Sequence, residues 1–302
     1  MLLKADKIFE AITRTALWVL TGLVGSMGLV LVVKSWPALL QFGGHFFIGH
    51  VWDPVTEEFG IFPIIYGTLV SSFLAVLLAA PLGIGIAVFL SELAPRSMKN
   101  ILSLLTEWLA AIPSVIYGLW GIFYLVPWLR RGPEPWLIDH FGFIPLFRGP
   151  PYGIGMFAAG LILAIMILPI ISSITREVLE AVPLEQREAA LALGATRWEA
   201  TRLAVLRYGR SGIIGAIFLG LGRALGETMA VTMVIGNTPQ IAASLFAPAQ
   251  TMASVIANEF SEATGDLHIS ALVEIGLALF MITFMINALA RLLVWKATQV
   301  KR

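Results

Sequence analysis

The sequence predicts an all-α, polytopic membrane protein with six transmembrane helices. Of its 302 residues, 58% are hydrophobic and 13% are charged, about half the charged share of an ordinary soluble domain. The mean hydropathy of +0.86 agrees, because so few charges cannot coat a soluble globule of this size. Six nearly charge-free runs are each long enough to cross about 30 Å of hydrocarbon as a helix. They are approximately Ala16–Val33, Ile64–Leu90, Leu109–Leu129, Tyr152–Thr175, Ile213–Gly236 and Ser270–Val294.

The first run predicts an uncleaved anchor helix within residues 1–35. Lys4, Lys7 and Arg14 precede it, as basic residues precede the apolar core of a signal peptide, but no small-residue cleavage site follows it. The other five runs have no low-complexity tract or linker between them, so we expect one bundle over residues 64–295.

The 20 Lys and Arg residues predict the orientation, because basic segments are retained in the cytoplasm. Fifteen fall at the termini and in the loops that would share their side, four fall in the opposite loops, and the last, Arg223, lies inside the fifth run. Both termini are therefore expected in the cytoplasm. The outer loop 237–269 has no Lys or Arg and three acidic residues, so it would repel a free anion. Within it, residues 252–260 are expected to form a short amphipathic helix that packs on the bundle.

Pro81 falls inside the second predicted span and Pro169 inside the fourth. Each removes a helical hydrogen bond and should kink its helix. A gating hinge and an ordinary membrane-helix proline, whose freed backbone groups neighbouring helices satisfy, are both open interpretations.

The inner loop 176–211 is expected to form a protruding knob of two short helices. Pro183 suits the first turn of a helix, and Gly194 is expected to end that helix before a second begins at Ala195. Leu184, Arg187, Glu188 and Leu191 form one stripe of the first helix at positions i, i+3, i+4 and i+7.

Two partners suit this knob, a groove in a soluble protein or the surface of an anionic membrane. Six arginines favour lipid, but five glutamates nearly cancel them. We therefore favour docking to a protein.

The knob resembles the EAA loop of the permeases of ATP-binding cassette (ABC) importers. The resemblance rests on Glu188, Ala189 and Ala190, with Gly194 four residues after the second alanine. In that family the loop seats in a cleft of the ATPase subunit. The family pattern closes with a Leu-Pro pair, whereas this chain has Leu206–Arg207, so the end of the second helix is less well defined by the resemblance.

A charged pair, Arg223 and Glu227, lies inside the fifth predicted span. Arg223 is expected about 15 Å deep, where insertion costs about 2.5 to 3.5 kcal/mol. Spacing of four residues places the two side chains on one helix face, where guanidinium and carboxylate can pair. Such charges usually mark a substrate or ion pathway, and an arginine suits a tetrahedral oxyanion. Gly222 and Gly226 should let another helix approach closely.

The string around this pair, residues 221–237, closely resembles the PstC-type permeases of phosphate-specific ABC importers. The resemblance is strong over about residues 185–238, and it implies the type I ABC importer permease fold. In that family the matching arginine and glutamate are tied to phosphate passage, and they correspond to Arg223 and Glu227 of this chain.

The resemblance also implies partners and a location. Two ATPase subunits, a homologous second permease and an external phosphate-binding protein would complete the importer in a prokaryotic cytoplasmic (inner) membrane, with membrane lipid around it. The chain has no phosphate-binding loop of its own, since none of its six lysines follows a glycine. We therefore expect no cofactor in this chain and ATP on a partner subunit.

Other functions are weaker alternatives. The permease could carry another oxyanion, namely sulfate, molybdate or phosphonate, or the chain could be a self-contained anion channel or secondary carrier. An intramembrane protease is disfavoured because Ser211 and His268 should lie on opposite sides of the membrane. We expect no catalytic or metal site: His45 and His50 have no nearby carboxylates, and the chain has no cysteine. A net charge of +1 offers no footprint for nucleic acid, and Glu274 stays unassigned.

Overall fold

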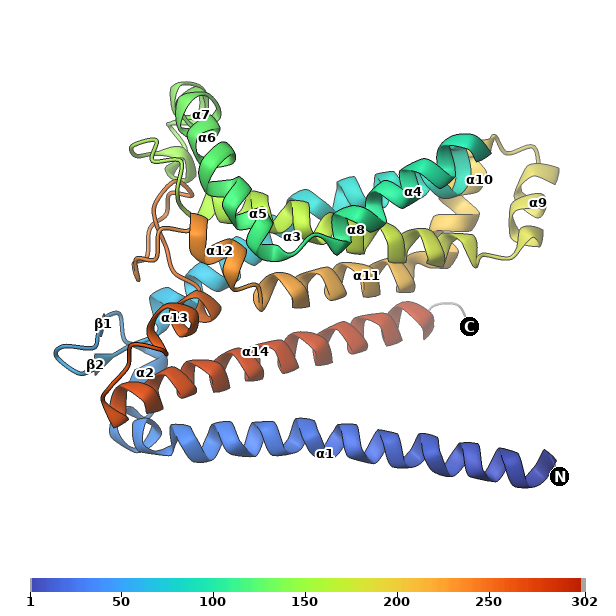
Figure 1. Cartoon of the computed structure of the whole chain (residues 1–302). Coiled ribbons are helices and arrows are strands. Elements are labelled where there is room, and N and C mark those ends of the chain that lie inside the picture. Colours follow the sequence, from blue (N-terminus) through green and yellow to red (C-terminus); the bar gives the residue numbers. More distant parts are fainter. Residues whose placement is uncertain (1, 300–302) are drawn as a thin grey trace.

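The computed structural model describes residues 2–299 and shows an elongated bundle of helices (Figure 1). Five helices are long and apolar enough to cross a membrane, and a bent pair of helices makes a sixth candidate span. The five are α1 (Leu2–Phe42), α3 (Phe62–Val88), α8 (Met156–Glu180), α11 (Arg207–Leu225) and α14 (Asp266–Gln299).

Two of the predicted spans are not continuous helices: the third bends, and the fifth breaks after Leu225. The prediction of an unbroken helix over Leu109–Leu129 is wrong, because α4 (Arg96–Ala111) and α5 (Ser114–Trp120) meet at a 90° bend. Ile112 is extended there, with φ −65° and ψ 127°, as expected for a residue that precedes a proline, here Pro113. The chain continues through the π-helical turn η2 (Gly121–Leu125) into α6 (Val126–Arg131).

The core of the bundle forms where α3 packs along α8. Small residues permit this approach: a methyl group on Gly160 would lie 2.5 Å from a side-chain carbon of Leu74. Pro81 and Pro169 both lie inside these two unbroken helices. Their role as hinges stays a prediction.

The N-terminal helix α1 is joined to α14 through a side chain. The Ser270 hydroxyl accepts a hydrogen bond from the Ala38 amide (3.1 Å) and donates to the Lys34 carbonyl (3.0 Å). A single hydroxyl is thus inserted into the hydrogen-bond ladder of α1, next to Pro37.

One end of the bundle carries its short elements. They are α2 (His45–Ile48), the antiparallel pair β1 (Trp52–Asp53) and β2 (Glu58–Phe59), α7 (Pro133–Phe141), η3 (Pro145–Phe147) and α13 (Met252–Glu259). The helix expected over residues 252–260 is confirmed, because Met252 and Val255 are fully buried against the bundle. The Trp52 indole also donates to the Glu259 carboxylate at 2.9 Å.

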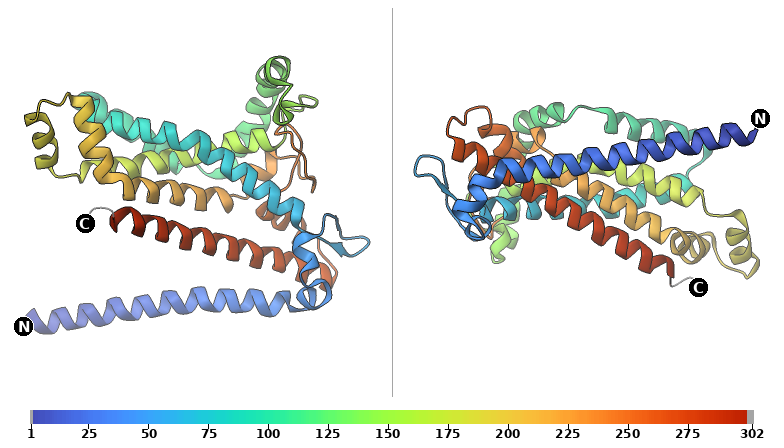
Figure 2. Two further views of the ribbon diagram at one scale, coloured as in Figure 1. Left: turned by 180° about the vertical axis from the view of Figure 1, so that it is seen from behind. Right: turned by 90° about the horizontal axis from the view of Figure 1, so that it is seen from below.

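The opposite end carries both termini and the two-helix knob formed by α9 (Leu184–Ala192) and α10 (Arg197–Ala200), as both views in Figure 2 show. The knob continues through the π-helical turn η4 (Thr201–Leu206) into α11. An even number of spans puts both termini at the same end, as the charge distribution predicts. Which end faces the cytoplasm stays a prediction.

Candidate functional site

The glycine turn predicted in the knob is confirmed. Gly194 has φ +85°, in the left-handed region. Its amide donates to the Leu191 carbonyl (3.0 Å), and the Ala195 amide donates to the Ala190 carbonyl (3.2 Å). These two bonds form a Schellman motif, the common way of closing a helix on a glycine.

The second helix of the knob begins at Arg197, two residues later than predicted. Thr196 and Glu199 form a capping box: the threonine hydroxyl accepts from the Glu199 amide, and the glutamate accepts from the Thr196 amide at 2.8 Å. This box fixes the start of α10. The sequence carries the Thr-x-x-Glu signal, which the prediction did not use.

The knob presents an open surface. Glu188 and Ala189 are exposed and Ala190 is half-buried, while Leu193 is 89% and Trp198 is 56% exposed. Exposed apolar groups of this size on a protruding segment suit contact with another protein. The predicted stripe divides, because Arg187 turns toward the bundle while its apolar neighbours stay exposed.

The structure separates Arg223 and Glu227, which were expected to pair on one helix. Helix α11 ends at Leu225, and a new helix, α12 (Met229–Val234), begins after a three-residue break. Arg223 therefore lies in the last turn of α11, whereas Glu227 lies in the break and accepts from the Ala230 amide at 3.4 Å. Within residues 2–299 no ion pair joins them, so the predicted i, i+4 pair is wrong.

The break places the two charges favourably with respect to the helix ends. A guanidinium in the last turn of α11 faces unpaired carbonyl groups, and a carboxylate before α12 faces unpaired amides. Arg223 is exposed and Glu227 is half-buried. Discontinuous helices with charged ends are a common way to build a solute site in a transporter.

Among the described residues, nothing packs against the small-residue face of α11. A methyl group on Gly215 or Gly222 would meet nothing within 4 Å, and one on Gly226 would touch only the Gly222 carbonyl, at 3.9 Å. The close helix predicted here is therefore absent from the described chain. Arg223 directly follows Gly222, so it lies on the adjacent face of the helix.

Tyr117 is a residue near this site that the sequence did not single out. Its hydroxyl donates to the Leu109 carbonyl at 2.7 Å, across the α4–α5 bend, and its ring is buried within electrostatic range of Arg223. On the same helix, Gly118 lets α12 pack closely, since a methyl group there would lie 2.5 Å from the sulfur of Met233. Helix α5, which follows the α4–α5 bend, therefore packs closely on α12, which follows the break after α11.

Glu274 is fully buried in α14. Neither of its carboxylate oxygens has a hydrogen-bond partner among the described residues. Glu274 therefore does not lie at the membrane–water interface, and its neighbours do not indicate a role for it.

Two alternative kinds of site, a serine protease site and a metal site, can be compared with the structure. Ser211 lies near the knob end of α11 and His268 at the opposite end of α14 (Figure 1), so the predicted separation of this pair is confirmed. In the part of the chain that the structure describes, no three His, Cys, Asp or Glu residues gather as metal ligands would.

Comparison with known proteins gives a consistent family. The profile of the family described as binding-protein-dependent transport system inner membrane component matches residues 79–298. The chain is 52% identical over 290 residues to the phosphate transport system permease protein PstC of Mesorhizobium japonicum, covering 95% of this chain and 89% of that one. It is 46% identical over 300 residues to the PstC of Haemophilus influenzae, covering 98% and 95%.

Solved structures show the same fold at low identity. The inward-facing MetNI methionine ABC transporter matches with a TM-score of 0.53 at 18% identity, over 79% of this chain and 94% of that chain. A bacterial ABC transporter that imports alginate matches with a TM-score of 0.55 at 14% identity, over 96% and 99%. The fold is that of type I ABC importer permeases. The chain therefore belongs to the family of binding-protein-dependent transport system inner membrane components, as a permease of the PstC type.

Proposed function

We propose that this chain is the transmembrane permease subunit of an ATP-driven phosphate importer and forms one half of the phosphate pathway. One observation carries the proposal: an exposed arginine, Arg223, lies at a helix break, on the face of α11 adjacent to its open glycines. The names of the PstC relatives support phosphate as the solute.

Arg223 suits a passing anion because it is unpaired within the described chain. A guanidinium presents a planar fork of donors that matches the oxygens of a phosphate group. Glu227 lies in the break between α11 and α12, four residues after Arg223, and we assign its carboxylate to the same pathway.

The open face of α11 is where a homologous second permease would pack. Glycines without neighbours permit close approach of another helix, and helix association in membranes depends on such small residues. A heterodimer closed over this face would line a path from both halves, with Arg223 facing into it.

The knob would couple this path to ATP hydrolysis. Glu188, Ala189 and Ala190 lie on its exposed helix and Gly194 turns the chain behind them. We propose that an ATPase subunit receives this surface, that two such subunits serve the two permeases, and that an external phosphate-binding protein delivers solute at the opposite end. This places the knob and both termini in the cytoplasm of a prokaryotic cell.

The test is uptake of labelled phosphate by proteoliposomes that hold this chain with its second permease, ATPase and binding protein. Uptake should require ATP and every component. Arg223→Gln should abolish uptake while the complex still assembles, and Arg223→Lys should restore only part of it, since charge returns without the fork. Arg291→Gln, an exposed arginine on α14, is the matched control.

Two results would contradict the proposal. Normal uptake by Arg223→Gln would remove the arginine from the pathway, and uptake by this chain alone without ATP would favour a channel or carrier. Inclusion of sulfate, molybdate and phosphonate as competitors separates phosphate from the alternative oxyanions.

A further inference from the structure

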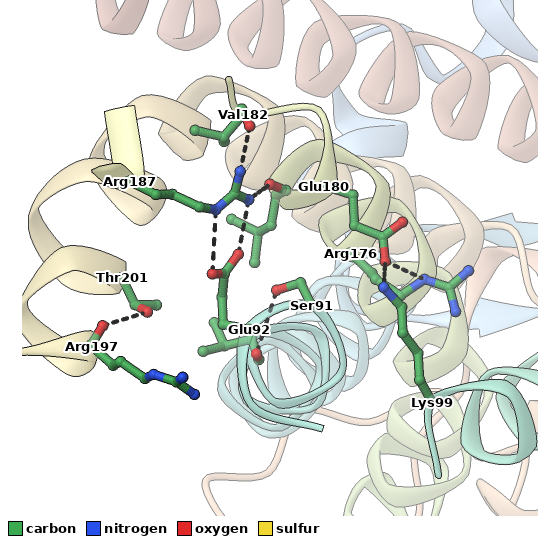
Figure 3. A network of polar contacts seen from close by, with 11 residues as sticks. Ser91, Glu92, Lys99, Arg176, Glu180, Val182, Arg187, Arg197 and Thr201 are labelled. Carbon is green, nitrogen blue, oxygen red and sulfur yellow. Dashed lines mark hydrogen bonds and ion pairs between the residues drawn. The ribbon is translucent and has the colours of Figure 1, made fainter. Parts of the chain in front are cut away.

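Arg187 connects the knob to the transmembrane bundle (Figure 3). Its guanidinium holds the carboxylate of Glu92 at two points, Nη2 to Oε1 at 2.9 Å and Nε to Oε2 at 3.4 Å. It also donates to the main-chain carbonyls of Leu179 (2.8 Å) and Val182. The side chains of Arg187 and Glu92 are only 20% and 13% exposed, so water screens this pair weakly.

Glu92 lies just beyond the C-terminal end of the spanning helix α3. It lies in η1 (Phe89–Leu93), a π-helical turn that continues α3 directly. An apolar cluster in this region joins the end of α3, the end of α8 and η4. Its buried members are Ala87, Val88, Leu179, Val182 and Val205.

The first helix of the knob has little else to fix it. No residue of α9 is buried, so apolar packing does not determine its angle. The side chain of Arg187 does connect α9 to the bundle, through its four hydrogen bonds to Glu92, Leu179 and Val182. A bidentate, charge-assisted contact fixes distance and orientation together.

We infer that Arg187 and Glu92 form a strut that holds α9 against the end of α3 and transmits movement of the knob to that helix. The inference rests on the proposed coupling function. Both residues are positioning residues, since neither touches solute. Glu92 itself lies in the π-helical turn η1, and the knob continues into a second one, η4. Such turns often occur at functional sites.

A second ion pair at the same end provides a matched comparison. Lys99 of α4 contacts Glu180 of α8 at 2.7 Å, and Arg176 approaches the same carboxylate at 3.9 Å (Figure 3). This network joins α4 to α8 and does not include α9. Lys99→Met therefore removes an ion pair nearby and leaves the strut intact.

The experiment measures the position of α9 and the coupling ratio in the assembled importer. The chain has no cysteine, so Ala192→Cys on α9 and Leu289→Cys on α14, both exposed, take spin labels without background from this chain. Pulsed electron resonance gives the distance distribution between them. Parallel samples without the labels give phosphate imported per ATP hydrolysed.

Glu92→Gln should broaden the distance distribution and lower the phosphate imported per ATP by roughly five- to tenfold, which corresponds to about 1 to 1.4 kcal/mol. Glu92→Arg should do more, because it opposes two guanidinium groups. Adding Arg187→Glu to Glu92→Arg should recover part of both readouts, since the charges again attract but the carbonyls of Leu179 and Val182 lose their donor. Lys99→Met should change neither readout.

An unchanged distance distribution in both Glu92 variants would overturn the strut. A broadened distribution with an unchanged coupling ratio would overturn transmission. Absence of ATP-driven phosphate uptake in the unsubstituted importer would instead refute the proposed function, and the distance measurement would still test whether the pair fixes α9.

Discussion

Gly194 provides a direct test of whether the shape of the knob matters for coupling. Its φ of +85° lies in the left-handed region, where a residue with a Cβ is disfavoured by about 1 to 2 kcal/mol. A methyl group built on Gly194 would meet nothing within 4 Å, so a side chain fits in space. The effect of a substitution should therefore come from the backbone alone.

This strain sets the expected magnitude. About 1 to 2 kcal/mol shifts the equilibrium between the native turn and other conformations by roughly 5- to 30-fold. The two hydrogen bonds of the turn, to the carbonyls of Ala190 and Leu191, would open in proportion. Gly194→Val should show the full shift because β-branched residues tolerate positive φ least. Gly194→Asn should stay within about twofold of the parent, since asparagine adopts this conformation readily.

The assay pairs coupling with local structure. Phosphate uptake and binding-protein-stimulated ATP hydrolysis are measured in the reconstituted importer, with assembly checked by size-exclusion chromatography. Hydrogen exchange over residues 184–200 reports the opening of the turn. We expect Gly194→Val to assemble, to exchange faster and to lose stimulated hydrolysis and uptake together, while Gly194→Asn retains all three properties.

Two outcomes would refute this reasoning. Equal, normal activity of both variants would mean that the left-handed turn is not needed. Equal loss in both would mean that any side chain at Gly194 obstructs the partner, because asparagine and valine differ in backbone preference far more than in size.

Three further predictions concern stability and topology. Gly67→Ala should destabilise the chain strongly in a thermal unfolding assay, because its Cβ would lie 2.2 Å from the Gln250 carbonyl oxygen. Gly85→Ala on the same helix should have little effect, because a Cβ there would meet nothing within 4 Å. Equal effects of the two substitutions would contradict the close approach at Gly67. Glu274→Met should raise stability by about 1 to 3 kcal/mol, since it replaces a buried carboxyl group that has no hydrogen-bond partner among the described residues. A lower melting temperature would show that the carboxyl group has a partner. Ala195→Cys should react with an impermeant thiol reagent only from the cytoplasmic side, and labelling from outside would reverse the orientation.

Hydropathy predicts most of the fold, because a helix that crosses a membrane needs a long apolar run that is visible in the sequence. Four of the six apolar runs correspond to continuous long helices, whereas the third bends at Pro113 and the fifth breaks after Leu225. The knob was predictable too, since Pro183 and Gly194 act on the backbone locally and need no tertiary context. The break at Pro113 follows from equally local chemistry, but the high hydropathy of Leu109–Leu129 masked it.

The strut could not be predicted from the sequence. Arg187 and Glu92 are 95 residues apart, and neither stands in a pattern that singles out the other. Only the fold brings the end of α3 beside α9. Spacing on one helix predicts local pairs, whereas a contact between elements depends on the packing of the whole bundle.

The same limit explains the error at Arg223 and Glu227. Spacing of four residues would pair them on a continuous helix, but Gly226 ends α11 between them. The glycines that suggested close packing, Gly222 and Gly226, meet no other helix among the described residues. A helix with an open glycine face and an exposed arginine is incomplete as a lipid-facing surface, because a charge in contact with hydrocarbon is costly. A second permease across that face would cover the glycines and enclose the guanidinium. The same features that made the single-helix prediction fail thus favour a pathway built between two subunits.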